Sequence, residues 1–233
     1  MRKIIAIGGG ELRERTTLKI DEYIAKLAKE HAGENRANAL FIPTASHDYM
    51  PYYNTFHKVY TGLFNIKTDV ALTVFKEVDL EKLKGKFEKA DVIYVGGGDT
   101  VFMMESWKQS GVLELMKQAY ERGVIIAGLS AGAICWFTDI YTDSAKEQTG
   151  EEYAMFKGLG WIKGVISPHY GTRMLDFDKI VCYNYDCAYG LEDDSALVLE
   201  DEEIIGSITS GGTVWKLECE NGTLKKQAIS VIE

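Results

Sequence analysis

The chain has 233 residues, of which 46% are apolar and only three are proline, and its formal net charge is −9. This composition is typical of an ordinary globular protein and excludes an intrinsically disordered one, and the length favours a single domain over residues 1–233. The chain contains no run of about eighteen apolar residues, so no membrane span is predicted. Its acidic net charge argues against nucleic acid and anionic membranes as partners.

The cysteines predict neither a zinc site nor an oxidising environment. They are Cys135, Cys182, Cys187 and Cys219. None has the close paired spacing of zinc ligands, and four unpaired thiols fit a reducing compartment. The apolar start of the chain is too short for a secretory signal. We therefore expect a cytoplasmic protein.

Short apolar runs alternate with amphipathic helical patterns through most of the chain. The runs predict strands, in chain order, over residues 4–7, 39–42, 70–75, 92–95, 124–129 and 165–166. Helices are expected where Ile20, Ile24 and Leu27 share one face, and then over 100–109 and 112–122. Fully apolar strands that alternate with helices predict a parallel sheet covered on both faces.

The C-terminal part follows a different pattern. Residues 196–199, 204–208 and 214–217 predict antiparallel strands at one edge of the sheet, because short charged or glycine-containing turns separate them. The polar stretch 141–160 is expected to be a long loop near the site. The predicted fold class is therefore α/β, with a three-layer, doubly wound, mostly parallel sheet and antiparallel strands at its C-terminal edge.

Three predicted strands end in glycine-rich turns, over residues 8–10, 96–98 and 128–132. Ligands bind beyond the carboxyl ends of parallel strands, and glycine lets backbone N–H groups approach a ligand closely. Neither glycine triplet has the spacing of a dinucleotide fingerprint or a P-loop, which argues against nucleotide binding. We interpret 8–10 mainly as a tight turn. Asp99 or Thr100 can cap the helix after 96–98 and leave the glycine N–H groups free for an anion.

The segment Gly128-Leu129-Ser130-Ala131-Gly132 matches the G-x-S-x-G pattern of a serine nucleophile. It follows a predicted strand and opens a predicted helix, which is the context that this pattern requires. The sharp turn would hold Ser130 in a strained conformation, and the N–H groups of Ala131 and Gly98 could bind an oxyanion. The alternative is a packed serine that caps a helix.

A serine nucleophile needs a neutral imidazole nearby to take its proton. His169 is the best placed of the four histidines, because it directly follows a predicted strand and Pro168 favours an extended chain before it. His31 and His57 lie in helical patterns, and His47 lies in a loop from which it could approach the site.

The carboxylate that would orient the imidazole cannot be chosen by spacing. Candidates lie on both sides of His169, and a charged run such as 192–194 is also typical of a solvated turn. The candidates are Asp139, Asp143 and Glu147 before the histidine and Glu192, Asp193 and Asp194 after it.

At these residues the chain resembles the dipeptidase E family of serine peptidases, which includes cyanophycinase. The matching segments are 94–100, 128–133 and 167–169, in the family's order and spacing. The resemblance implies a flavodoxin-like sheet similar to that of class I glutamine amidotransferases, with a serine in place of their cysteine. It also implies a set of roles: Ser130 as nucleophile, His169 as base, and the N–H groups of Gly98 and Ala131 as oxyanion donors.

The resemblance also bears on the acid and the substrate. In dipeptidase E the acid lies in a segment resembling 190–193, which points to Asp193, whereas in cyanophycinase it lies sooner after the serine, near Glu147. Dipeptidase E removes N-terminal aspartate and holds the substrate carboxylate with an arginine after the histidine, for which Arg173 is the candidate. The segment before Arg173 is shorter than in the family, and the opening 7–11 looks more like cyanophycinase.

We therefore expect a serine peptidase that hydrolyses a small peptide through an acyl-enzyme, without a metal or organic cofactor, as a monomer or homodimer. An esterase of the α/β-hydrolase kind is disfavoured, because that fold places the acid before the histidine in the chain. The other alternative is a non-catalytic protein that keeps the pocket to bind a small molecule.

Overall fold

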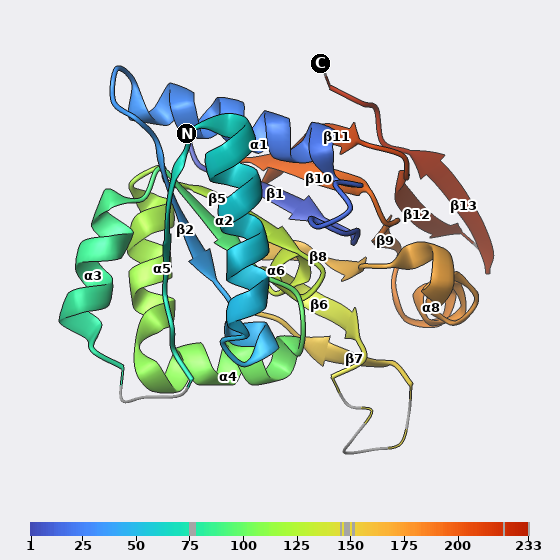
Figure 1. Ribbon diagram of the computed structural model, residues 1–233. Helices are drawn as coiled ribbons and strands as arrows, with labels where there is room; N and C mark the ends of the chain where they lie inside the picture. Colours follow the sequence, from blue (N-terminus) through green and yellow to red (C-terminus); the bar gives the residue numbers. More distant parts are fainter. Residues whose placement is uncertain (75–77, 145, 147–149, 151, 221, 233) are drawn as a thin grey trace.

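A computed structural model describes residues 1–74, 78–144, 146, 150, 152–220 and 222–232. Seven strands form a first sheet in the order β11-β10-β1-β5-β4-β2-β3 (Figure 1). Its parallel strands are β1 (Lys3–Ile7), β5 (Ile125–Leu129), β4 (Val92–Val95), β2 (Asn38–Ile42) and β3 (Lys67–Val70). β10 (Ser195–Glu200) and β11 (Glu203–Thr209) extend the sheet beyond β1 as antiparallel strands.

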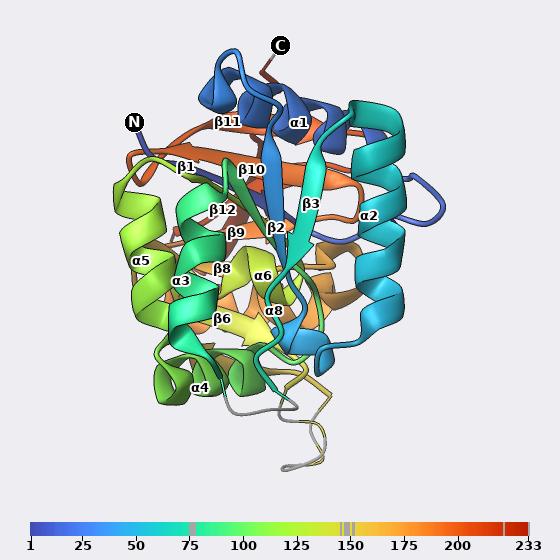
Figure 2. The same cartoon turned by 60° about the vertical axis from the view of Figure 1, so that its left-hand side comes forward.

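Helices cover both faces of this sheet, because its central strands are apolar on both faces. Successive side chains of a strand point to opposite faces, and along β1 Ile5 packs on one side and Ile4 on the other. The side of Ile5 is covered by α1 (Leu18–Ala32) and α2 (Met50–Phe64), as Figure 2 shows. The helices on the side of Ile4 are α3 (Leu80–Lys89), α4 (Thr100–Ser110) and α5 (Val112–Glu121).

Six further strands form a second sheet, in the order β13-β12-β9-β8-β6-β7, which the sequence pattern did not predict. Its parallel strands are β6 (Phe137–Thr142), β8 (Ile162–Ser167) and β9 (Cys187–Leu191). Helix α8 (Tyr170–Asn184) packs on this sheet. β12 (Val214–Glu220) pairs here with β9 and β13 (Thr223–Ala228) and is not part of the first sheet's edge, so its predicted position was wrong.

The predicted α/β class is confirmed: mixed sheets of mostly parallel strands are flanked by helices, and antiparallel strands follow at the C-terminal end. The parallel strands β1, β2, β4 and β5 carry predicted apolar runs, which are buried between layers. Among the described residues, no helix combines the length and apolarity that a membrane crossing needs.

The third strand lies earlier than predicted, over Lys67–Val70, so that only Val70 belongs to both the predicted and the observed strand. β3 ends at Val70, and the chain after it is tied down by a side chain, since the N–H groups of Thr73 and Val74 both donate to Asp48 Oδ2 at 2.7 Å. Backbone groups held in this way are not available for strand pairing. Phe75, where the predicted strand ended, lies outside the described residues.

The polar stretch 141–160 also differs from its prediction, because it is not one continuous loop. β7 (Ala154–Lys157) lies within it and pairs antiparallel with β6, from Asp139 opposite Lys157 to Thr142 opposite Ala154. The pairing gives the second sheet one of its edges.

A buried carboxyl group lies where α1 meets α2. Asp21 is 1% exposed and accepts hydrogen bonds from Thr17 Oγ1 at 2.7 Å and from Tyr60 Oη at 2.8 Å. Burial raises the pKa of Asp21 to about 6, against about 3.9 for an ordinary aspartate. The folded state therefore binds more protons than the unfolded state between about pH 4 and 6, and stability falls as the pH rises through that window.

Asp21→Asn should remove this pH dependence, because the amide does not ionise. Compared with the wild type, its free energy of unfolding in urea should rise by up to about 3 kcal/mol between pH 4 and pH 7. Glu30→Gln, at an exposed position in the last turn of α1, is the matched control and should show no such change. An Asp21→Asn effect of equal size at both pH values would contradict the assignment.

Candidate active site

Ser130 lies in a sharp turn between β5 and the four-residue helix α6 (Ala131–Ile134). Its backbone has φ +52° and ψ −108°, in the left-handed half of conformational space that non-glycine residues seldom occupy. The small neighbours are needed sterically, because a Cβ at Gly128 would lie 2.1 Å from the carbonyl oxygen of Gly132. This strained turn exposes the hydroxyl at the carboxyl end of the sheet.

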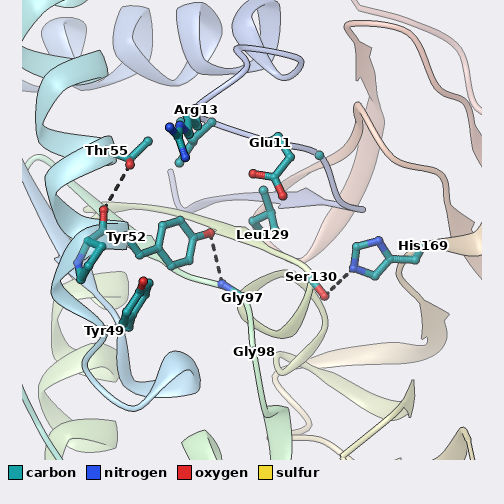
Figure 3. A pocket seen from close by; sticks show the side chains of 13 residues that line it. Glu11, Arg13, Tyr49, Tyr52, Thr55, Gly97, Gly98, Leu129, Ser130 and His169 are labelled. Carbon is teal, nitrogen blue, oxygen red and sulfur yellow. Dashed lines mark hydrogen bonds between the residues drawn. The ribbon is translucent and has the colours of Figure 1, made fainter.

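Ser130, His169 and Asp193 form a continuous hydrogen-bonded chain of side chains. His169 Nε2 lies 2.9 Å from Ser130 Oγ, and His169 Nδ1 lies 2.6 Å from Asp193 Oδ1. Figure 3 shows the imidazole pointing at the serine. His169 itself has φ +48° and immediately precedes α8. In such an arrangement the imidazole can take the hydroxyl proton, and the carboxylate holds the imidazole in the required orientation.

The other candidate carboxylates are directed elsewhere. Glu192 accepts from Trp215 Nε1 at 2.9 Å and from the N–H of Thr213 at 3.0 Å. The remaining described candidates are also engaged: Asp139 with Lys157, Asp143 facing Arg173 at 3.6 Å, and Asp194 with Thr16. Glu147 lies outside the described residues. Within the described part of the chain, Asp193 is thus the carboxylate that reaches His169.

Three successive carbonyl groups at the end of β1 hold these segments together. The oxygen of Ile7 accepts from the N–H of Ser130 at 2.9 Å, that of Gly8 from His169 at 3.0 Å, and that of Gly9 from Asp194 at 3.1 Å. A Cβ at Gly9 would lie 1.9 Å from Asp193 Oδ1 and 2.5 Å from the imidazole ring. The glycines that the sequence suggested as a tight turn therefore also make room for the histidine and the aspartate.

Two backbone N–H groups near Ser130 are available as donors. Neither Gly98 nor Ala131 donates its N–H to a protein acceptor in the described residues. Gly98 has φ +137°, and a Cβ there would lie 2.2 Å from the carbonyl oxygen of Ala45, so the position requires glycine. Asp99 caps α4 by accepting from the N–H of Phe102 at 3.0 Å, as predicted. The arrangement leaves Gly98 and Ala131 free to bind an anion.

Two cavities, each of about 460 Å³, share Gly98, Ser130 and His169 in their walls. The first also has charged and aromatic walls: Glu11 and Arg13 from the loop after β1, and Tyr49, Tyr52 and Thr55 at the start of α2 (Figure 3). The second is lined by Asp99, Asp143, Ser144 and Lys146. Burial raises the pKa of Tyr52 to about 12, so this phenol stays neutral.

Arg173 does not lie on the wall of either cavity. Its side chain is 4% exposed, donates to the carbonyl oxygen of Tyr141 at 3.1 Å and lies over the ring of Tyr153 at 4.6 Å. Burial lowers the pKa of its guanidinium. On α8, Arg173 thus packs against Tyr141 and Tyr153 outside the walls of both cavities, and its role as a substrate contact stays a prediction.

Glu11 and Arg13 were not among the site residues predicted from the sequence. They follow the first glycine triplet, and a charged loop directly after a glycine-rich strand end could have indicated them. Among the described residues, no cluster of three or more His, Cys, Asp or Glu side chains is arranged to hold a metal ion.

The chain was compared with known proteins. The model of peptidase family S51 matches residues 4–206. An uncharacterized peptidase of Bacillus subtilis, YgaJ, is 33% identical over 215 residues, which cover 90% of this chain and 88% of that protein. An uncharacterized peptidase of Listeria innocua is 28% identical over 74% of this chain and 85% of its own length.

The fold has a counterpart among solved structures. The crystal structure of a peptidase from an acI-B1 actinobacterium superposes with a TM-score of 0.71 at 18% sequence identity, and the match covers 100% of this chain and 96% of that one. The family match over most of the chain agrees with the resemblance carried by the glycine and serine motifs. On these grounds the chain belongs to peptidase family S51, the dipeptidase E family.

Proposed function

We propose that this peptidase is a serine peptidase of small peptides, with Ser130 as nucleophile, His169 as general base and Asp193 as the orienting acid. The single observation that carries the proposal is the hydrogen-bonded chain of the three side chains, with its serine in a left-handed turn. The two cavities of about 460 Å³ beside it suit a peptide of a few residues.

The proposed reaction proceeds through an acyl-enzyme. Ser130 Oγ attacks the carbonyl carbon of the substrate while its proton passes to His169 Nε2. The N–H groups of Gly98 and Ala131 stabilise the negative oxygen that forms, and Asp193 stabilises the imidazolium. His169 then gives the proton to the leaving nitrogen as the C–N bond breaks.

A water molecule completes the cycle. It attacks the ester carbonyl, gives its proton to His169, and releases the acid as Ser130 Oγ recovers that proton. All of these steps use groups of the chain itself. We also propose a cytoplasmic location, supported by the four free cysteines, which suit a reducing compartment.

Ser130→Ala should abolish both peptide hydrolysis and covalent labelling by a fluorophosphonate, because only the activated hydroxyl can attack either reagent. Turnover of a dipeptide panel and mass spectrometry of the labelled protein measure the two effects, with circular dichroism to show that the variant folds. A wild type that neither hydrolyses peptides nor becomes labelled would favour the non-catalytic binding protein instead.

Asp193→Asn should lower kcat by about 10²-fold. A buried triad aspartate contributes about 10⁴-fold in a comparable substitution, but the side chain of Asp193 is 54% exposed, so water can replace part of its effect. The matched control is Glu192→Gln, whose carboxylate bonds Trp215 and Thr213 rather than His169. If Glu192→Gln lowered kcat as much as Asp193→Asn, the assignment of the acid would be wrong.

Gly9→Ala should lower kcat by about 10²-fold or more with little change in far-UV circular dichroism. The added methyl group would displace the imidazole from Ser130, and a displacement of about 1 Å costs about that factor. Gly62→Ala on α2 is the control, because a Cβ there meets nothing within 4 Å. Full activity of Gly9→Ala would show that the close packing against His169 and Asp193 is not required.

A further inference from the structure

Building on the proposed peptidase activity, we propose that Arg13 determines specificity by binding a carboxylate group of the peptide substrate. The family resemblance implied a cation for this purpose at Arg173, which the structure buries against Tyr141 and Tyr153. Arg13 comes from the opposite end of the chain and lines the same cavity as Ser130 and His169 (Figure 3).

The loop that carries Arg13 is a closed and anchored structure. The N–H of Glu11 donates to Thr16 Oγ1 at 2.9 Å, and the N–H of Thr16 donates back to the carbonyl oxygen of Glu11 at 3.1 Å. Thr16 Oγ1 donates to Asp194 Oδ1 at 2.5 Å, and Leu12 is buried, with 3% exposed. These contacts anchor the backbone on both sides of Arg13 to the segment that carries the proposed acid, while the side chain of Arg13 itself is exposed to solvent.

The side chain of Arg13 makes no ion pair or hydrogen bond within the described residues, although it belongs to a chain of net charge −9. Other cations near sheet ends have carboxylate partners, as Arg2 has in Asp201 and Lys3 in Glu200. Among the described residues that line the first cavity, Arg13 is the one with a permanent positive charge. A guanidinium group presents parallel N–H donors that match the two oxygens of a carboxylate.

Glu11 supplies the opposite charge in the same wall, and its side chain also makes no hydrogen bond or ion pair within the described part of the chain. Its carboxylate opposes the binding of a second anionic group nearby. Neutralising Glu11 should therefore strengthen the preference for a carboxylate, whereas neutralising Arg13 should remove it. Two substitutions with opposite effects on one preference distinguish electrostatic recognition from a general loss of loop structure.

The carboxylate could be an acidic side chain or the C-terminus of the peptide, and four dipeptides separate these sources. Asp-Leu and Asn-Leu differ in the side chain, and their C-terminal amides lack the terminal carboxylate. kcat/KM would be measured on all four with the wild type, Arg13→Gln, Glu11→Gln and the control Arg15→Gln. Arg15 lies on the same loop, is exposed and does not line the cavity.

The wild type should prefer one carboxylate over its amide by about 10- to 100-fold, the range for a hydrogen bond to a charged group. Arg13→Gln should lose that preference with the amide substrate unaffected, Glu11→Gln should increase it, and Arg15→Gln should keep it. Loss of the Asp-over-Asn preference identifies the side chain as the ligand; loss of the acid-over-amide preference identifies the C-terminus.

Fluorophosphonate labelling of Ser130 runs in parallel and tests the proposed activity separately from Arg13. If the wild type and Arg13→Gln are labelled at equal rates but Arg13→Gln keeps the carboxylate preference, or if the wild type has none, the role of Arg13 is overturned while the serine mechanism stands. If Ser130 is not labelled in the wild type and no peptide is hydrolysed, the proposed function fails and the inference with it.

Discussion

The site depends on three successive carbonyl groups where β1 ends and the first glycine triplet begins. Those of Ile7, Gly8 and Gly9 accept, in turn, the N–H groups of Ser130, His169 and Asp194. Each of these donors belongs to a segment that carries one side chain of the hydrogen-bonded chain. Because a backbone hydrogen bond constrains both distance and direction, three of them in succession hold three distant segments in fixed relative positions, as the proposed proton transfer requires.

The same strand end explains why glycine follows it. Gly9 lies so close to His169 and Asp193 that any side chain would occupy their place. The chain then continues into the loop of Glu11 and Arg13, which Thr16 ties to Asp194. One short segment thus supports the side chains of the proposed site, leaves the space that they occupy and supplies the charged wall of the cavity.

The site lies at the junction of the two sheets. Ser130 follows β5 of the first sheet, and His169 follows β8 of the second. Asp193 lies on the connection from β9 in the second sheet to β10 in the first. A shift of one sheet against the other would therefore change the distances between these side chains. The apolar core that joins the two sheets opposes such a shift. Within this core the rings of Trp107 and Trp136 stack on each other.

The sequence by itself determined the features that depend on neighbours along the chain. The apolar runs of the buried parallel strands, the cap at Asp99 and the G-x-S-x-G turn at Ser130 are local patterns, and the structure contains each of them. The family resemblance added two alternatives for the acid, near Asp193 or near Glu147. Local patterns could not choose between them, since spacing along the chain does not show which carboxylate side chain faces His169.

Tertiary structure decided the rest. The second sheet pairs strands whose polar and short segments carry a weak strand pattern, as in β7 and β13. The contact of His169 with Asp193, the packing of Gly9 against both, and the position of Arg13 in the cavity wall beside Ser130 all join residues far apart in the chain. Such contacts are set by how the layers pack against one another, and a reading of local sequence has no access to that information.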